Sequence, residues 1–253
     1  TELSDFSRRS SLCRKDQKES NLYQHQLRPA ATLNPAELSI ILKLLIIGIW
    51  IVSLLCIADL VRRLGDNDGE LSRKIVHIGT AATIPMAWTF GLSKMLIVSC
   101  GIVVTTLTLI NHRWRLLKSI EDIGRRSFGT SAYGLSITLL VALLWPERAD
   151  AVTAGILVMG IGDGCAGLIG RRLNSPRWTL FGQTKSLAGT VTMAIASGLC
   201  LIVLALSTQA AISVPTLLLI SGSAVVLEQF SFAGIDNLSV PIGVALLWQQ
   251  LIR

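Results

Sequence analysis

The chain has 253 residues, of which 51% are apolar and only 15% are charged, and its formal net charge is +7. A mean hydropathy of +0.59 argues against a soluble or disordered chain and is typical of a polytopic membrane protein. The five cysteines are scattered, without a CxxC or a Cys/His cluster, so they indicate neither a disulfide framework nor a zinc site.

The first 34 residues differ from the rest of the chain. Residues 1–34 are polar, mix both charge signs and lack apolar periodicity, a composition that cannot bury enough apolar surface to fold. The sequence therefore predicts a disordered tail at 1–34, followed by one helical membrane domain at 35–253.

Eight apolar runs follow in chain order. A membrane-spanning helix needs about 20 apolar residues, and several of these runs are shorter. We therefore predict an all-α, multi-pass integral membrane protein with seven or eight transmembrane helices. The runs cover residues 38–61, 75–90, 95–111, 129–145, 152–170, 188–206, 211–227 and 238–251.

The lysines and arginines between the runs are distributed unevenly. The odd-numbered connections, at 62–74, 112–127, 171–187 and 228–237, carry thirteen, whereas the even-numbered ones carry two. This asymmetry places the odd connections in the cytoplasm or stroma. Six basic residues in the tail oppose the resulting placement of the N-terminus, whose side stays open. Topology thus explains the positive charge, and no nucleic-acid partner is expected.

The fifth run contains GIGDGCAGLIGRR, residues 160–172, with a single carboxylate, Asp163, between two glycines. Counting back from Arg171, Asp163 lies about 12 Å inside the span. A carboxylate at membrane depth is costly and commonly marks a functional site. The alternative is a glycine-rich packing face whose Asp163 pairs with a basic residue.

Two further motifs flank apolar runs. TKSLAGT, at 184–190, places Lys185 and two hydroxyls at the start of a helix, where a phosphate would be stabilised. It lacks the Walker A spacing, and a simple helix cap is the alternative. EQFSFAGIDNLSVP, at 228–241, carries Glu228 and Asp236. These acids could bind Mg²⁺, which commonly takes one or two carboxylates plus phosphate oxygens, or form a solvated acidic loop.

A fourth motif, ELSRKIVHIGT at 70–80, brings Arg73, Lys74 and His77 to the start of the second run, and RRSFGTSAY at 125–133 is a weaker fifth. Arg73 and His77 share one helical face. Positive charge for a triphosphate, carboxylates for Mg²⁺ and access to a lipid hydroxyl are the requirements of phosphoryl transfer. The motifs together therefore predict this reaction at the cytoplasmic ends of the spans.

The order RKIVH, RRSFG, GDGCAGLIGRR, KSLAGT, E…DNLSVP resembles the polyprenol kinase family, which includes dolichol, phytol and farnesol kinases. The resemblance runs from about Arg62 to the C-terminus, and the length is similar to that of the short phytol kinases. One departure is Thr190, where the family usually has serine. The resemblance implies a membrane enzyme that transfers phosphate from a nucleoside triphosphate, typically CTP, to a lipid alcohol.

The resemblance also implies roles for particular residues. Asp163, Lys185 and Asp236 would be catalytic, and Asp163 and Asp236, with Glu228 as a further candidate, would hold Mg²⁺. The remaining residues implied in binding the nucleotide are Arg73, Lys74, His77, Gly162, Gly164, Ser186, Gly189 and Asn237.

Similarity to the short phytol kinases implies phytol as substrate, with farnesol or geranylgeraniol as alternatives, and a cyanobacterial or plastid membrane. The phytyl phosphate would serve phytol salvage and tocopherol biosynthesis. Two other enzymes combine similar motifs, a CTP-dependent cytidylyltransferase of the CDP-diacylglycerol synthase type and a CTP-dependent diacylglycerol kinase. A transporter with Asp163 and His77 as ion ligands is the non-enzymatic alternative. The chain length of the alcohol, the nucleotide and the oligomeric state stay open.

Overall fold

The computed structural model describes residues 35–64, 69–114 and 128–252. Contacts divide the chain into two units, residues 1–44 and 45–253. Of the first unit only 35–44 are described, and they begin helix α2 (Pro35–Leu64). The predicted tail at 1–34 lies outside the described residues. The account below concerns the second unit.

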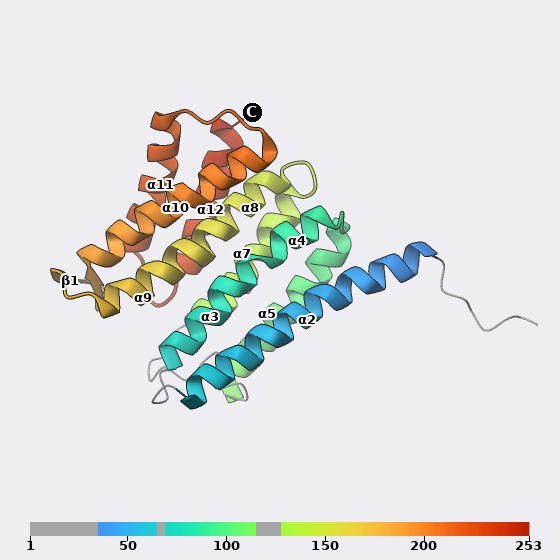
Figure 1. Cartoon of the computed structure of the whole chain (residues 1–253), viewed down its shortest axis with the longest axis horizontal. Helices are drawn as coiled ribbons and strands as arrows, with labels where there is room; N and C mark the ends of the chain where they lie inside the picture. The colour runs from blue at the N-terminus through green and yellow to red at the C-terminus, as the bar shows by residue number, and fades with distance from the viewer. Residues whose placement is uncertain (1–34, 65–68, 115–127, 253) are drawn as a thin grey trace, which may run out of the picture. The chain divides into compact units, whose positions relative to one another are not determined.

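The described part of the second unit consists of helices and one β-hairpin (Figure 1). Every predicted apolar run coincides for most of its length with helix, so the all-α class is confirmed apart from the hairpin. After α2 come α3 (Gly69–Ala81), α4 (Thr83–Thr89), α5 (Lys94–Trp114), α7 (Gly129–Leu144), α8 (Ala149–Leu157), α9 (Gly164–Arg172), β1 (Arg177–Leu180), β2 (Gln183–Ser186), α10 (Leu187–Thr208), α11 (Val214–Gln229) and α12 (Asp236–Leu251).

Four helical stretches are long and apolar enough to cross a membrane, by length and composition. They comprise Ser39–Leu64, Lys94–Trp114, Ala149–Arg172 and Leu187–Thr208. Helices α7 and α11 are apolar but shorter. These features are those of a membrane protein, and the count of seven or eight spans stays a prediction.

The second predicted run, 75–90, forms two helices instead of one. Helix α3 ends at Ala81 and α4 begins at Thr83. Pro85 lies in the first turn of α4, where its missing N–H costs no helical hydrogen bond. Its ring would collide with the carbonyl of Ala81 if the helix continued unbroken. The chain therefore breaks at Ala82, three residues before this proline.

The Asp163 segment is the central helix of the unit. Over Ala149–Arg172, 67% of the most apolar window is buried inside the molecule, against 11% for Lys94–Trp114. Helices α3, α10 and α12 pack around it. Between α8 and α9 the helix widens into a π-helical turn, η1 (Val158–Asp163). Such a turn contains one extra residue and frequently lies at functional sites.

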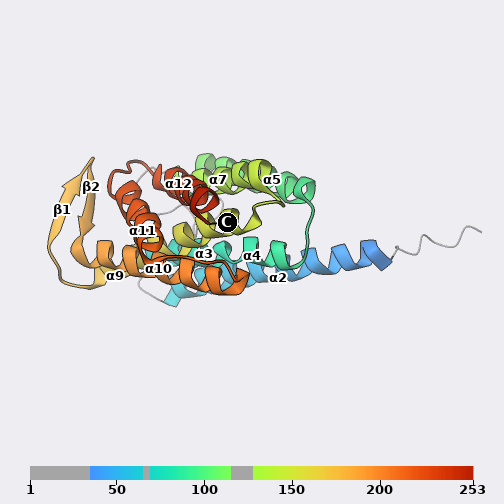
Figure 2. The ribbon, with the colours of Figure 1, turned by 90° about the horizontal axis from the view of Figure 1, so that it is seen from above.

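The fifth connection, predicted as a loop, contains the hairpin β1–β2. The strands are antiparallel and pair Trp178 with Lys185 and Leu180 with Gln183. Phe181 and Gly182 form the turn. The hairpin lies at one end of the bundle, beside α9 and α11 (Figure 2). The sequence did not predict these strands, because strands of four residues leave little alternation to detect.

A polar clasp ties the last helix to the turn between α7 and α8. Arg148 donates to both carboxylate oxygens of Asp150 (3.1 Å each), to the carbonyl of Gln249 (2.8 Å) and to that of Ile252 (3.0 Å). The indole of Trp248 donates to Asp150 Oδ2 at 2.8 Å. The C-terminal end of α12 is thereby held in place.

Candidate active site

A cavity of about 850 Å³ opens between the hairpin, α3, α9, α10 and the segment joining α11 to α12. Its volume is within the range of small-molecule binding sites. Three of the four odd-numbered connections contribute residues to its lining. The predicted residues in its lining are Arg73, Lys74, Asp163, Lys185, Ser186, Gly189, Glu228, Asp236 and Asn237.

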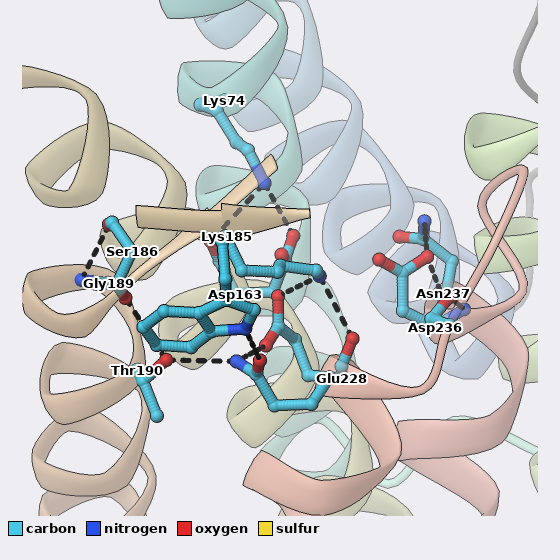
Figure 3. Close-up of polar contacts among 12 residues, drawn as sticks. Lys74, Asp163, Lys185, Ser186, Gly189, Thr190, Glu228, Asp236 and Asn237 are labelled. Carbon is cyan, nitrogen blue, oxygen red and sulfur yellow. Dashed lines mark hydrogen bonds and ion pairs between the residues drawn. The ribbon is translucent and has the colours of Figure 1, made fainter. Parts of the chain in front are cut away.

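The partner of Asp163 is Lys74, 89 residues earlier in the chain (Figure 3). Lys74 Nζ donates to Asp163 Oδ2 at 2.5 Å and to the Asp163 carbonyl at 3.2 Å. Both side chains are buried, with exposed fractions of 5% and 13%. No hydrogen bond from the described residues reaches Asp163 Oδ1. The pair therefore neutralises a buried charge while leaving one carboxylate oxygen able to bind a ligand.

Lys185 and Glu228 form a second buried ion pair. Lys185 Nζ contacts Glu228 Oε1 and also donates to the Glu228 carbonyl at 2.9 Å. The amide of Gln229 donates to Glu228 Oε2 at 2.9 Å, so both oxygens of this carboxylate are engaged. Glu228 thus holds Lys185 in position.

Two residues that support this ion pair, Trp178 and Gln229, were not predicted from the sequence. Gln229 Nε2 also donates to Thr190 Oγ1 at 2.9 Å, and the indole of Trp178 donates to Gln229 Oε1 at 3.1 Å. Trp178 and Gln229 therefore join β1, α10 and α11 around Lys185. The strand register pairs Trp178 with Lys185 and so would indicate that Trp178 lies beside the site. That register can be assigned only when the hairpin is known.

Asp236 is the buried carboxylate without an ion pair among the described residues that line the cavity. Its Oδ1 accepts from the backbone N–H of Asn237 at 3.0 Å and from Asn237 Nδ2 at 3.1 Å. Its own N–H donates to Ser231 Oγ at 2.6 Å. Figure 3 shows Asp236 and Asn237 together, apart from Ser186 and Thr190. Oδ2 therefore remains available.

The electrostatics around Asp236 favour a bound cation. Burial raises the pKa of Asp236, which precedes the apolar run 238–251, and the negative charge of Asp163 raises it further. Lys185 and Lys74 act in the opposite direction. Five basic side chains and four acidic ones line the cavity as a whole, namely Arg73, Lys74, Arg171, Arg177 and Lys185 against Glu70, Asp163, Glu228 and Asp236. Asp236 is the acid among them without an ion pair to a described residue, and a divalent cation near it would compensate its charge.

Ser186 and Gly189 line the cavity but have local structural contacts. Ser186 is the N-cap of α10, accepting from the N–H of Gly189 at 3.2 Å, and its hydroxyl also donates to the carbonyl of Gly170 at 3.2 Å. A Cβ on Gly189 would lie 3.1 Å from the carbonyl oxygen of Ala166. The capping interpretation of TKSLAGT therefore holds for its serine, and Lys185 is the residue that faces Glu228.

Gly162, Gly164 and His77 lie outside the cavity lining. A Cβ on Gly162 would meet Met193 Sδ and Ser197 Oγ, both at 2.9 Å, and one on Gly164 would collide with Ile78. These glycines let α10 and α3 approach the central helix closely. His77 is buried, with Nε2 at 3.6 Å from Asp163 Oδ2 and its ring against Tyr133. The packing alternative thus applies to the glycines around Asp163, whereas Asp163 itself faces the cavity.

The fit to Mg²⁺ depends on the free carboxylate oxygens. Among the described residues, no three His, Cys, Asp or Glu side chains are close enough together to hold a metal ion by themselves. Mg²⁺ bound with a nucleotide needs only one or two carboxylates, because phosphates and water complete its octahedron. Asp163 Oδ1 and Asp236 Oδ2 fit that requirement, whereas the oxygens of Glu228 are already engaged.

Comparison with known proteins identifies the family. No family model matches the chain, and no solved structure matches it. The chain is similar to a phytol kinase of Synechocystis sp., with 36% identity over 219 residues that cover 85% of this chain and 93% of that protein. An identity of this size over nearly the whole relative, with Asp163 and the two lysines gathered at one cavity, shows that the chain belongs to the polyprenol kinase family.

Proposed function

We propose that the protein phosphorylates an isoprenoid alcohol, with phytol as the preferred substrate and CTP as the phosphate donor. The main support is the cavity in which two buried Lys–carboxylate pairs adjoin Asp236. The phytol kinase relative supports the substrate class. The nucleotide and phytol are expectations from the resemblance, as is a role in phytol salvage toward tocopherol.

In the reaction the alcohol oxygen forms a bond to the γ-phosphorus of the nucleotide. The bond between the γ-phosphorus and the oxygen that bridges it to the β-phosphorus breaks, so that CDP leaves. Lys185 and Lys74 would neutralise charge on the phosphate oxygens, because both amines lie at the cavity wall. Asp163 Oδ1 and Asp236 Oδ2 would hold Mg²⁺, which supplies charge compensation on the phosphates. The hydroxyl proton would pass to a cavity carboxylate or to water.

We further propose a multi-pass membrane protein whose cavity faces the cytoplasm or stroma. The positive odd-numbered connections support this orientation, and two of them, 62–74 and 171–187, contribute to the cavity. A nucleotide would then enter from the aqueous side while the alcohol arrives from the bilayer.

The test is phosphate transfer by the purified protein in mixed micelles, with γ-labelled CTP and phytol, farnesol, geranylgeraniol or diacylglycerol. Label is expected in phytyl phosphate, with CDP released, and chelation of Mg²⁺ should abolish it. ATP, GTP and UTP in parallel reactions would identify the donor.

Asp236→Asn is the preferred inactive control, because it breaks no ion pair of the described residues and should fold. It should lower turnover on the order of a hundredfold or more. Pyrophosphate release with phosphatidate, in place of CDP release with an alcohol, would overturn the proposal in favour of a cytidylyltransferase. Label in phosphatidate alone would indicate a diacylglycerol kinase.

A further inference from the structure

Two phenylalanines from distant segments meet at the rim of the cavity. Phe181, at the tip of the hairpin, lines the cavity. Phe232 lies in the segment between α11 and α12, and the two ring centroids are 6.5 Å apart with an interplanar angle of 50°. This separation and tilt are typical of interacting aromatic rings. Both side chains are nevertheless exposed, Phe181 by 66% and Phe232 by 53%.

The backbone is held in an unfavourable conformation at Phe181 and at the residue that follows Phe232. Phe181 has φ of 49° and Gly182 has φ of 75°, as in a type I′ turn, which strongly prefers Asn-Gly. A bulky residue at positive φ is a genuine outlier. Ala233, next to Phe232, has φ of 51°. Strained residues of this kind cluster at ligand-binding sites, where the side chain is retained for its contacts.

Packing within the protein does not account for this aromatic pair, because exposed rings contribute little burial. The lining beneath the rim is polar or charged and includes Lys185 and Asp236. An alcohol that reacts there must send its hydroxyl among these groups. The carbon atoms behind the hydroxyl then need an apolar contact at the entrance, which exposed aromatic side chains provide.

We infer that Phe181 and Phe232 bind the isoprenoid chain of the acceptor immediately behind its hydroxyl and thereby determine which alcohols react. This inference rests on the proposed function. The neighbouring exposed side chain of Ile235 extends the apolar rim, which favours a lipid chain over a nucleotide base.

Phe181→Asn provides a sharp test, because it removes the ring while placing a preferred residue in the turn. The variant should fold as well as the wild type. It should raise the KM for phytol roughly tenfold, from the lost apolar contact, and leave the KM for the nucleotide unchanged. Phe232→Ala should act in the same direction, and Phe232→Leu, which retains apolar volume, should restore much of the affinity.

Phe230→Ala is the matched control, since Phe230 is 62% exposed in the same segment but outside the pair. It should leave the KM for phytol unchanged. An equal effect of Phe230→Ala would overturn the inference in favour of general bilayer contact. A rise in the nucleotide KM alone would overturn it in favour of base stacking, and an unaltered phytol KM in Phe181→Asn would refute it directly.

A binding measurement separates this inference from the proposed function. A photoreactive analogue of phytol should label residues 181 and 232 of the wild type, and excess phytol should prevent the labelling. Labelling without phosphate transfer to any alcohol would overturn the proposed activity while supporting the binding site. Phosphate transfer without labelling of these residues would support the proposed activity and overturn the binding site.

Discussion

The ion pair between Lys185 and Glu228 makes a quantitative prediction. Both side chains are about nine-tenths buried, with exposed fractions of 10% and 9%. Glu228→Gln would leave the Lys185 ammonium buried beside a neutral amide. The hydrogen bond from Lys185 Nζ to the backbone carbonyl of residue 228 would remain. Removing one partner of a buried pair typically costs 3–5 kcal/mol, and the retained bond places this variant near the lower end, at about 3 kcal/mol.

The expected loss corresponds to a fall in Tm of roughly 6–12 °C for a domain of this size, measured by thermal unfolding of the purified protein in detergent. Replacing both residues, in Lys185→Gln with Glu228→Gln, should restore most of the Tm because neither charge of this buried pair remains. Phosphate transfer should stay low in both variants, since each lacks a charged, correctly held Lys185.

Asp59→Asn is the matched control for an exposed pair. Asp59 and Arg63 lie 2.7 Å apart with exposed fractions of 45% and 76%, so its effect should stay below about 1 kcal/mol. The reasoning is refuted if Glu228→Gln shifts the Tm no more than this control. It is also refuted if the double variant is as unstable as the single one.

Three further predictions concern other parts of the fold. Asp236→Asn should raise the Tm at neutral pH, because the raised pKa of Asp236 means that its ionised carboxylate destabilises the folded state, and this difference in Tm should shrink as the pH falls through that pKa. The same variant should keep the low turnover expected of it above. Gly155→Ala should lower the Tm by the equivalent of about 1–3 kcal/mol, since its methyl group would collide with the carbonyl of Pro241, whereas Gly198→Ala, with open space around it, should be neutral or slightly stabilising. Arg148→Met should lower the Tm by breaking the clasp at the far end of α12, yet leave the KM for both substrates unchanged in enzyme assayed well below its Tm.

The sequence predicts most of the helices because their apolar runs are long and charged residues lie in the connections at the ends of these runs. It also predicts that the residues of four motifs belong to one site. The reason is that positively charged connections alternate along the chain with nearly uncharged ones, which assigns the motifs to the same side of the membrane. It could not predict which acid meets which lysine. Lys74 reaches Asp163 and Lys185 reaches Glu228 only after α3, α10 and α11 pack against the central helix.

The hairpin was not predicted for a local reason. Its strands have only four residues each, and Phe181–Gly182 lacks the Asn-Gly signal of a two-residue turn. Trp178 and Gln229, which support Lys185, were missed with it, because their role depends on the strand register. The interruption at Pro85 was readable in principle, since a proline inside an apolar run is a probable helix boundary.

The π-helical turn at Val158–Asp163 makes the length of this segment as important as its composition. Removing one residue there would restore an ordinary α-helix and rotate all that follows by about 100° around the axis. Asp163 would then turn away from Lys74, although both residues would still be present in the chain. We expect related enzymes to tolerate apolar substitutions at Val158, Met159 and Ile161 but not insertions or deletions within 158–162, so that spacing itself is a constraint that a residue-by-residue mutational scan would not detect.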